Sequence, residues 1–383
     1  MPLSYSTAPP QKIALILQGG GARGAYEVGV LKAIAEINLR RVSPFQIVCG
    51  ASVGAINAAR VAATSTDFQR GIEALEALWS SLTCNSVYDT RALPLLIRTG
   101  HWALALMFGR FGFHAPDGLL DSAPLHHLLT TEFDRRHLEH VIHAGALSAL
   151  CISTSSYGEG KAVTFFEAHD DIAPWSRSRR EGVPTRIGPQ HLLASSALPF
   201  VFAPVRIKGR YYGDGALRLT SPLSPAIHTG ADKIVIIATR DNLPIPAADR
   251  AKAQTEPTVG DMAGVALDIL FNDNLETDHE RLSRINQTLA LLTPEARQKT
   301  PLRFIDTIFL APSQDLRPIA QAHAHRLPAP IRLLMHSVGS WGHDGRLESY
   351  LLFEAGYIGA LIDLGYRDTI ARADELAAFL FAS

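Results

Sequence analysis

Two short segments of this chain, one around Ser52 and one around Asp214, combine a reactive side chain with flanking glycines. One of them is Gly50-Ala51-Ser52-Val53-Gly54, which follows a short apolar run and has the pattern glycine-x-serine-x-glycine. In such a segment the serine lies on a sharp turn between a strand and a helix, which exposes its hydroxyl at the helix N-terminus. The partial positive charge of that terminus favours an alkoxide and an anionic intermediate. Ser52 is therefore a candidate nucleophile, and the alternative is a serine that only caps the helix.

A glycine-rich loop, Gly19-Gly20-Gly21-Ala22-Arg23-Gly24, lies upstream between a predicted strand and a predicted helix. The first N–H groups of a helix have no partner within it and bind negative charge. The loop could therefore hold the pyrophosphate of a dinucleotide, since it matches G-x-G-x-x-G, or form an oxyanion hole. A dinucleotide site also needs an acidic residue near the end of the next strand. That strand ends at Cys49-Gly50 without an acidic residue, and Glu36, the nearest by position, falls in the preceding helix. A third interpretation is a tight turn that serves packing alone.

A serine nucleophile also needs a base that accepts its proton. The chain contains fifteen histidines, so its composition does not exclude a serine–histidine triad. The other candidate is Asp214, which lies between Gly213 and Gly215 at the end of a predicted hairpin. An aspartate between glycines usually marks a turn. Asp214 is a candidate base because the two other glycine-rich motifs accompany it.

The elements around these motifs predict how they meet. Residues 12–17 and 45–49 are short apolar runs typical of buried strands, and residues 25–37 between them have helical periodicity. A strand–helix–strand unit of this length implies two parallel strands with a right-handed crossover. Ligands bind at the carboxyl edge of such a sheet, so the glycine-rich loop and Ser52 are expected to lie side by side there.

The rest of the chain continues the alternation of strands and helices. Strands are predicted over 149–155, 162–167 and 233–238, a hairpin over 205–212, and helices over 53–63, 68–82, 123–129, 189–198 and much of the chain after 259. We therefore predict an α/β fold, a three-layer α/β/α sandwich with a mostly parallel central sheet. A catalytic domain is expected over 12–240 and a mainly helical C-terminal extension, packed on the core, over 241–383. The boundary is expected in the proline-containing stretch 242–257.

Composition argues against several classes of protein. The net charge of −1 lacks the basic excess typical of nucleic-acid binding, so no nucleic-acid partner is expected. The three cysteines, Cys49, Cys84 and Cys151, form no Cys-x-x-Cys pair, which argues against a zinc site or a disulfide framework. The first residues lack the pattern of a secretory signal, and no apolar run approaches the ~20 residues that span a bilayer. A cytoplasmic location, with peripheral membrane contact as an option, is the expectation.

An apolar cluster lies between predicted helices. It contains Trp102, Leu104, Leu106, Met107, Phe108, Phe111 and Phe113. Ordinary core is one interpretation. A lid or a membrane-facing patch over the active site is the other, since a lipase needs such a surface when its substrate sits in a bilayer.

Taken together, the motifs resemble those of the patatin-like phospholipases of bacterial type. Residues 18–24 are similar to the family's anion-binding loop, residues 50–54 to its nucleophile elbow, and residues 213–216 to its Asp-Gly motif. Residues 194–199 and 219–227 add weaker similarity, so the likeness extends over about residues 12–239, with a looser one at 348–367.

The resemblance implies a lipid acyl hydrolase, of the phospholipase A or lysophospholipase type, with a Ser52–Asp214 dyad. Ser52 attacks the ester, Asp214 takes its proton, and the loop Gly19, Gly20, Gly21, Ala22 and Arg23 holds the oxyanion. Gly24, Gly50, Gly54, Gly213 and Gly215 complete the motifs. No metal or cofactor is implied, and the expected partner is a glycerolipid or phospholipid. A dinucleotide-binding oxidoreductase and a non-catalytic lipid-binding protein remain alternatives, and the sequence does not indicate an oligomeric state.

Overall fold

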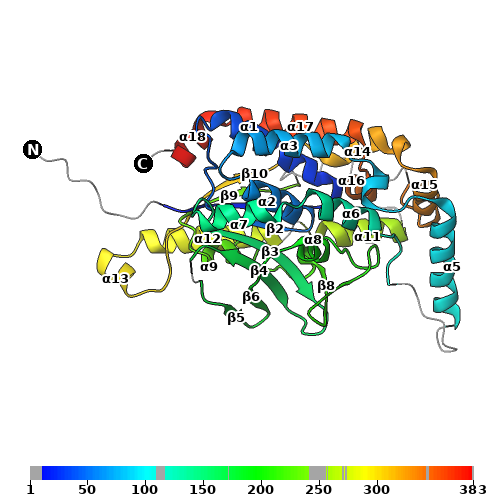
Figure 1. Cartoon of the computed structure of the whole chain (residues 1–383), viewed down its shortest axis with the longest axis horizontal. Coiled ribbons are helices and arrows are strands. Elements are labelled where there is room, and N and C mark those ends of the chain that lie inside the picture. The colour runs from blue at the N-terminus through cyan, green and yellow to red at the C-terminus, as the bar shows by residue number, and fades with distance from the viewer. Residues whose placement is uncertain are drawn as a thin grey trace, which may run out of the picture.

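A ten-stranded sheet forms the centre of the molecule, in the order β10-β9-β1-β2-β3-β4-β6-β5, with β8 paired to β3 and β7 to β8 (Figure 1). The computed structural model describes residues 11–108, 117–170, 172–240, 256, 258–269, 271, 274–341 and 345–381. The strands are β1 Ile13–Leu17, β2 Ile47–Ala51, β3 Ala149–Ser156, β4 Ala162–Ala168, β5 Trp175–Arg177, β6 Arg180–Pro184, β7 Val205–Ile207, β8 Arg210–Asp214, β9 Lys233–Ile237 and β10 Asp306–Leu310.

Helices cover both faces of this sheet. The N-terminal helices are α1 Ala25–Ile37, α2 Val53–Ala63, α3 Phe68–Ser81, α4 Cys84–Val87, α5 Ala92–Phe108, α6 Ala123–Glu132, α7 Arg135–His143, α8 Pro189–Ser195 and α9 Ser224–His228. The C-terminal helices are α11 Val259–Asp268, α12 Asn274–Ala290, α13 Pro294–Gln298, α14 Leu316–His323, α15 Ala329–Ser337, α16 Arg346–Leu351, α17 Ala355–Ile370 and α18 Ala373–Phe381. Two short 3-10 helices matter for the site: η1 Gly21–Gly24 and η3 Gly215–Leu217.

The central strands run in one direction. The adjacent strands β10, β9, β1, β2 and β3 are all parallel to one another. Strands β4 and β8, which also pair with β3, are antiparallel to it. The prediction of a mostly parallel sheet is confirmed. Parallel strands bring the ends of β1 and β2 to the same edge, where the glycine-rich loop and Ser52 follow them.

Alternating side chains along the strands build two separate apolar layers. Leu15 and Leu17 of β1 belong to the larger cluster, which includes residues of α1, α2, α3 and α17. Ala14 and Ile16 belong to a second cluster with residues of α9 and α12. Since successive side chains of a strand point to opposite faces, a continuous apolar strand must be covered on both sides. The three-layer sandwich is confirmed, and the helical C-terminal part supplies helices to both faces.

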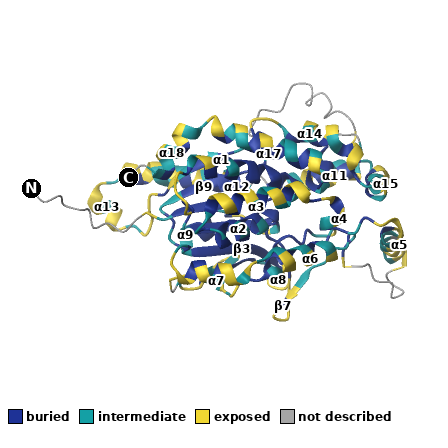
Figure 2. Cartoon of the chain, turned by 45° about the horizontal axis from the view of Figure 1, so that its top comes forward, coloured by how far each residue is buried: buried dark blue, intermediate teal, exposed yellow. Residues whose placement is uncertain are grey.

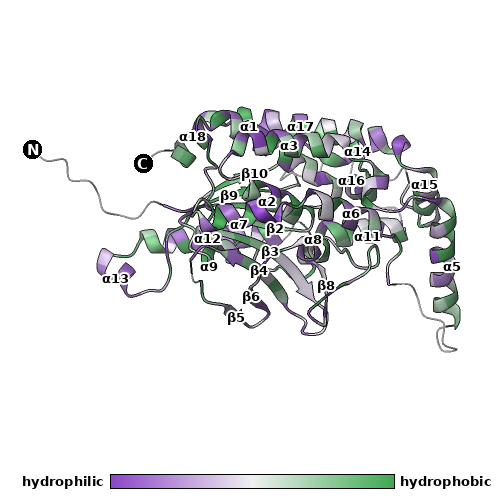
Figure 3. Cartoon of the chain, in the orientation of Figure 1, coloured by the Kyte–Doolittle hydropathy of each residue, from purple (hydrophilic) through white to green (hydrophobic). Residues whose placement is uncertain are grey.

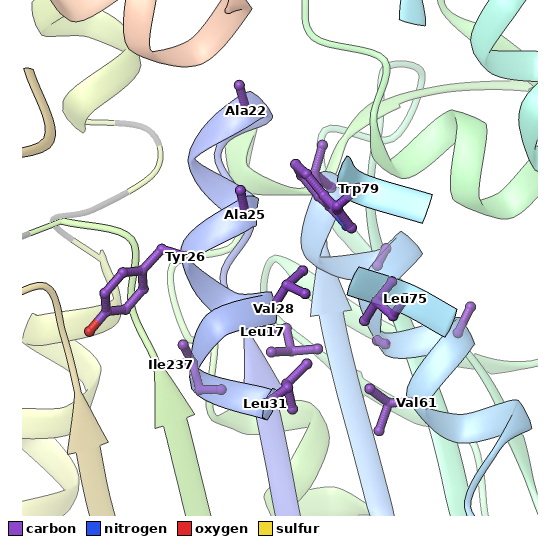
Figure 4. Packing of buried hydrophobic residues seen from close by; sticks show 14 of the residues in the cluster. Leu17, Ala22, Ala25, Tyr26, Val28, Leu31, Val61, Leu75, Trp79 and Ile237 are labelled. Atoms are coloured by element: carbon purple, nitrogen blue, oxygen red, sulfur yellow. The ribbon is translucent and has the colours of Figure 1, made fainter. Parts of the chain in front are cut away.

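Helix α1 packs directly on the strands that carry the site. Its residues Ala25, Val28 and Leu31 are spaced three apart and fully buried. Figure 4 shows them beside Leu17 of β1 and Ile237 of β9, with side chains of α2 and α3 on the other side. This spacing places the three side chains on one face of the helix, which explains why α1 is held firmly behind the loop that precedes it.

The C-terminal helix α17 lies unusually close to α1. A Cβ added to Gly29 would lie 2.0 Å from the carbonyl oxygen of Ile362, and one added to Gly365 would lie 2.3 Å from that of Tyr26. The two backbones therefore touch at glycines, which only residues without a side chain permit. Through α17 and the edge strand β10, the C-terminal part is packed into the same core as the N-terminal part of the chain.

Most predicted elements are present, and the differences have identifiable causes. The predicted helix 189–198 ends at Ser195, and α5 extends over a stretch that was interpreted only as an apolar cluster. The prediction lacks strands β5, β6 and β10, because they lie at or next to the two edges of the sheet, where they are only partly buried and none of them is apolar along its whole length. Of the predicted boundary 242–257 only residue 256 is described, and Phe111 and Phe113 lie outside the described residues.

Within the part of the chain that the structure describes, no helix combines the length and apolar character needed to cross a bilayer.

The contact between α1 and α17 gives a stability prediction. Gly29→Ala places a methyl group against the Ile362 carbonyl and should lower the free energy of unfolding by about 1–3 kcal/mol. Gly359→Ala is the matched control on α17, because nothing lies within 4 Å of its added Cβ. Alanine is the better helix former, so this control should raise the free energy of unfolding by up to about 1 kcal/mol. Urea unfolding of both variants measures the difference, and equal stabilities would contradict the close packing.

Candidate active site

The turn between β2 and α2 has the geometry of a nucleophile elbow. Ser52 has φ 53° and ψ −135°, a conformation that is strained for a residue with a side chain. A Cβ on Gly50 would lie 2.3 Å from the carbonyl oxygen of Gly54, and one on Gly54 would lie 2.4 Å from that of Leu17. The turn is therefore too tight for side chains at either flanking position, which explains the glycine-x-serine-x-glycine spacing.

A second serine holds this strained turn. Ser195, at the end of α8, accepts a hydrogen bond from the Ser52 N–H at 3.0 Å and donates one to the Ser153 carbonyl on β3 at 2.6 Å. It is fully buried. The sequence had marked Ser195 only as part of a weaker family similarity. Its hydroxyl connects the elbow to the next strand, so we regard it as a positioning residue for Ser52.

The sheet register brings Asp214 to the elbow. Ala51 pairs with Ser153 on one side of β3, and Asp214 pairs with Thr154 on the other side. A Cβ on Gly215 would lie 3.2 Å from the Cβ of Ala51. The aspartate therefore reaches the end of β2 from across a single intervening strand, as the motifs required.

Asp214 is a buried carboxylate with one oxygen bound and one open. Its Oδ1 accepts the Ala216 N–H at 2.9 Å, whereas Oδ2 is buried and has no partner that meets normal hydrogen-bond geometry among the described residues. The Ser52 hydroxyl is nevertheless close enough to the carboxylate to affect its pKa as a hydrogen-bond donor. Burial raises the pKa of Asp214 from 3.8 to about 7, while the Ala216 N–H and the Ser52 hydroxyl oppose the rise. Such a group can accept a proton near neutral pH.

The glycine-rich loop lies against the elbow. Gly19, Gly20 and Gly21 have φ of 81°, 115° and 58°, the left-handed region that favours glycine. A Cβ on Gly19 would lie 3.1 Å from the Cβ of Ser52. The loop therefore packs directly beside the candidate nucleophile.

The amides of this loop differ in whether they are already used. The Gly19 N–H donates to Glu27 Oε1 at 2.7 Å, and the Arg23 N–H donates to the Gly20 carbonyl at 3.3 Å. In the described residues, the N–H groups of Gly20, Gly21 and Ala22 have no acceptor. The candidate oxyanion donors are therefore the N–H groups of these three residues, because the N–H groups of Gly19 and Arg23 already have acceptors.

Arg23 is buried against the C-terminal part of the chain. Its side chain is 3% exposed and donates to Ser349 Oγ at 2.8 Å. It also forms an ion pair with Asp268 at 3.3 Å and stacks over the Tyr350 ring, 4.0 Å from the centroid. These partners belong to the C-terminal part, so Arg23 fastens the loop to it.

The remaining motif glycines mark close contacts. A Cβ on Gly24 would lie 2.7 Å from Val53 Cγ1, and one on Gly213 would lie 2.6 Å from the Tyr157 hydroxyl. Tyr157 is half exposed. Burial raises the pKa of its hydroxyl, and the negative charge of Asp214 raises it further. The sequence did not single out Tyr157, which lies beside the Asp-Gly turn because β3 pairs with β8.

The role of Ser195 gives a testable prediction. Ser195→Ala leaves the Ser52 N–H without its acceptor, so the elbow loses one of the contacts that hold its strained conformation. We expect ester hydrolysis to fall by about 10-fold or more in kcat, with the fold retained. Ser196→Ala is the matched control, because the neighbouring hydroxyl is also buried but has no partner in the described residues. Equal kcat values for the two variants would contradict the assignment.

Comparison with solved structures finds several distant likenesses. VipD from Legionella pneumophila is 13% identical with a TM-score of 0.36, over 96% of this chain and 67% of that one. Human GIVD cytosolic phospholipase A2, solved with methyl gamma-linolenyl fluorophosphonate, is 13% identical with a TM-score of 0.43, over 96% of this chain and 58% of that one. ExoU from Pseudomonas aeruginosa, solved with SpcU, is 15% identical with a TM-score of 0.27, over 95% of this chain and 77% of that one.

These TM-scores are all below 0.5, so the family assignment does not depend on them. No curated protein sequence matches the chain significantly. The family model described as Patatin-like phospholipase matches residues 15–227, more than half of the chain, and this range contains the elbow, the glycine-rich loop and Asp214. The chain therefore belongs to the patatin-like phospholipase family.

Proposed function

We propose that this protein hydrolyses acyl esters of glycerolipids, phospholipids above all, through Ser52 and Asp214. The observation that carries the proposal is the meeting of three features at one sheet edge. These features are a serine on a strained turn, a buried carboxylate and a loop. Among the described residues, one oxygen of the carboxylate and three amides of the loop have no hydrogen-bond partner. Membership of a phospholipase family favours this activity over dinucleotide-dependent oxidoreduction.

The proposed reaction has two halves. Ser52 Oγ attacks the ester carbonyl carbon as its proton passes to Asp214, and the carbonyl oxygen becomes an oxyanion held by the amides of Gly20, Gly21 and Ala22. The C–O bond to the leaving alcohol then breaks, and Asp214 returns the proton to that alcohol. Water attacks the acyl-enzyme with Asp214 again as base, which releases the fatty acid and restores Ser52.

A dyad without histidine fits the surroundings of these residues. No histidine among the described residues is hydrogen-bonded to Ser52 or Asp214, and the shift in the pKa of Asp214 arises from burial, the Ala216 N–H and Ser52 alone. A carboxylate with a pKa near 7 is a far better base than one near 4. Burial thus gives Asp214 the proton affinity that a histidine supplies in a triad.

The dyad predicts a loss of activity with no loss of fold. Ser52→Ala and Asp214→Asn should each lower kcat for a soluble p-nitrophenyl ester by at least about 10³-fold. Wild-type activity should rise with pH through about 7, because Asp214 accepts a proton only when ionised. Its pKa is raised in the folded state, so ionisation costs stability above pH 4, and Asp214→Asn should melt at an equal or higher temperature than wild type at pH 8.

Three outcomes would contradict the dyad: full activity in either variant, activity that rises as the pH falls below 7, or no hydrolysis of any ester by the wild-type protein. The last outcome would favour the catalytically silent lipid-binding alternative.

We also propose that helix α5 brings the site to a lipid surface. It stands at one end of the molecule (Figure 1), is largely exposed (Figure 2), and is mainly hydrophobic (Figure 3). Its exposed large apolar side chains are Leu93, Leu96, Ile97, Leu104, Met107 and Phe108. They recur at spacings of three, four and seven residues, so they share one side of the helix. This is the arrangement by which a helix lies in a membrane interface.

Two further observations favour a lipid partner for α5. The helix contains no acidic residue and carries Arg98 and His101, so anionic head groups would not repel it. Phe200, which is 76% exposed, lies beside Trp102 of α5 with ring centroids 6.5 Å apart. It follows Ala197 closely in the chain, and the Ala197 carbonyl accepts the Asp214 N–H at 2.9 Å. Phe200 therefore connects α5 to the chain segment that contacts Asp214.

Substitutions on α5 test the lipid-surface role. The triple variant Leu93→Ser, Leu96→Ser, Met107→Ser should lower hydrolysis of vesicles of phosphatidylcholine and phosphatidylglycerol by about 10-fold or more, since apolar area drives interfacial binding. Its hydrolysis of a soluble ester should stay as in wild type. Leu291→Ser is the control, because this residue is 87% exposed and follows directly after α12. Unchanged vesicle hydrolysis in the triple variant would exclude α5 as the contact.

A further inference from the structure

A second buried carboxylate is hydrogen-bonded to the glycine-rich loop. Glu27, in the first turn of α1, is 0% exposed. Its Oε1 accepts the Gly19 N–H at 2.7 Å, and its Oε2 accepts a hydrogen bond from the Asn57 side chain at 2.8 Å. Both oxygens are therefore engaged by N–H donors, one from the loop and one from α2.

Asn57 can meet Glu27 in only one orientation. Its Nδ2 also donates to the Gly24 carbonyl at 3.2 Å, while its Oδ1 accepts the Trp79 Nε1–H at 2.8 Å. Turning the amide over would break both of these bonds. Glu27, Asn57 and Trp79 thus form a fixed polar network that joins the loop to α1, α2 and α3, and buried polar groups bonded in this way favour one arrangement.

The first three residues of the loop need such a restraint because they have no side chains with which to anchor themselves. Gly19, Gly20 and Gly21 lack side chains, and glycine passes between backbone conformations at low steric cost. Only the amides beyond Gly19 are open to an oxyanion, and their direction depends on how Gly19 is held. The bond from the Gly19 N–H to Glu27, together with the bond from Thr239 Oγ1 to the Gly19 carbonyl at 2.6 Å, fixes that point.

We propose that Glu27, in its ionised form, is the positioning residue of the oxyanion hole, a role that rests on the hydrolytic function proposed above. Its carboxylate accepts the hydrogen bond from the Gly19 N–H and so holds the Gly20, Gly21 and Ala22 amides toward the reacting carbonyl. Glu27 makes no contact with substrate. It contributes to the rate only through the geometry of the loop.

Ionisation matters because both partners of Glu27 are donors. A neutral carboxyl or an amide at this position presents a hydrogen on one side, which opposes either the Gly19 N–H or the Asn57 amide. Burial raises the pKa of Glu27 to about 7, while the hydrogen bonds from Gly19, Asn57 and the Gln18 backbone oppose the rise, and none of these groups is charged. The acceptor form of Glu27 therefore becomes populated over the same pH range as the base form of Asp214.

Glu27→Gln tests this role with almost no change in size. The variant should lower kcat for a soluble p-nitrophenyl ester by about 10- to 100-fold while KM changes by less than about 3-fold, because misplaced amides weaken the transition state more than the ground state. Glu36→Gln is the matched control, since Glu36 is an exposed carboxylate on the same helix, bonded to the Tyr366 hydroxyl at 2.7 Å. It should behave as wild type in both kcat and KM.

The pH profile provides a readout that a purely structural role would not change. In wild type two carboxylates must be ionised, so log kcat should fall with a slope above one as the pH is lowered below 7. In Glu27→Gln only Asp214 remains, and the slope should be one. A folded Glu27→Gln variant with kcat within 2-fold of wild type would overturn the proposal.

If Glu27→Gln does not fold, the wild-type slope decides alone: a slope above one supports the proposal and a slope of one rejects it. Failure of this proposal would leave the proposed function standing as long as Ser52→Ala abolishes hydrolysis.

Discussion

The site depends on the close approach of two backbone turns at the carboxyl edge of the sheet. A Cβ on Gly54 would lie 2.7 Å from the Gly19 amide nitrogen, and one on Gly19 would lie 2.4 Å from the Ala51 carbonyl. Neither turn can retreat, because β1 and β2 are hydrogen-bonded neighbours in register up to Leu17 and Gly50. The glycine-rich loop and the nucleophile elbow therefore form one packed unit, in which Gly19 of the loop lies against Ser52 of the elbow.

Two buried carboxylates serve this unit in different ways. Neither Asp214 nor Glu27 has a charged partner that acts on its pKa, and burial raises both values to about 7. Asp214 keeps one oxygen without a normal hydrogen bond, so it can receive a proton, whereas both oxygens of Glu27 are occupied by N–H donors. Burial raises the pKa of both carboxyl groups, so it is their hydrogen bonds that distinguish the proposed base, Asp214, from the proposed positioning residue, Glu27.

The sequence predicted what local patterns encode and left out what depends on distant packing. The strands before the motifs, the helix α1 and the turn at Ser52 follow from short apolar runs and glycine spacing, and the structure contains them. Ser195 and Glu27 carried no such signal, because a serine in a helix and a glutamate in an amphipathic segment are common on surfaces. Their importance arises from β3 and α2, which bring Ser153 and Asn57 to them.

The C-terminal part shows the same limit. Edge strand β10 is five residues long and pairs only with β9, so its pattern is hard to separate from the helices around it. Arg23, which the sequence groups with the oxyanion-binding loop, is bound to Asp268, Ser349 and Tyr350, which lie hundreds of residues away in the chain. No local pattern could indicate these partners. They show that residues of the C-terminal part hold a loop that lies near the N-terminus of the chain.

Labelling with an alkyl fluorophosphonate, followed by digestion and mass mapping, tests the central claim most directly, because the reagent modifies only a serine that is activated as a nucleophile. The account predicts a single adduct on the peptide that contains Ser52, formed faster as the pH rises through about 7 and absent when Asp214 is replaced by asparagine. An adduct on a different serine, or none on the folded protein at pH 8, would contradict it.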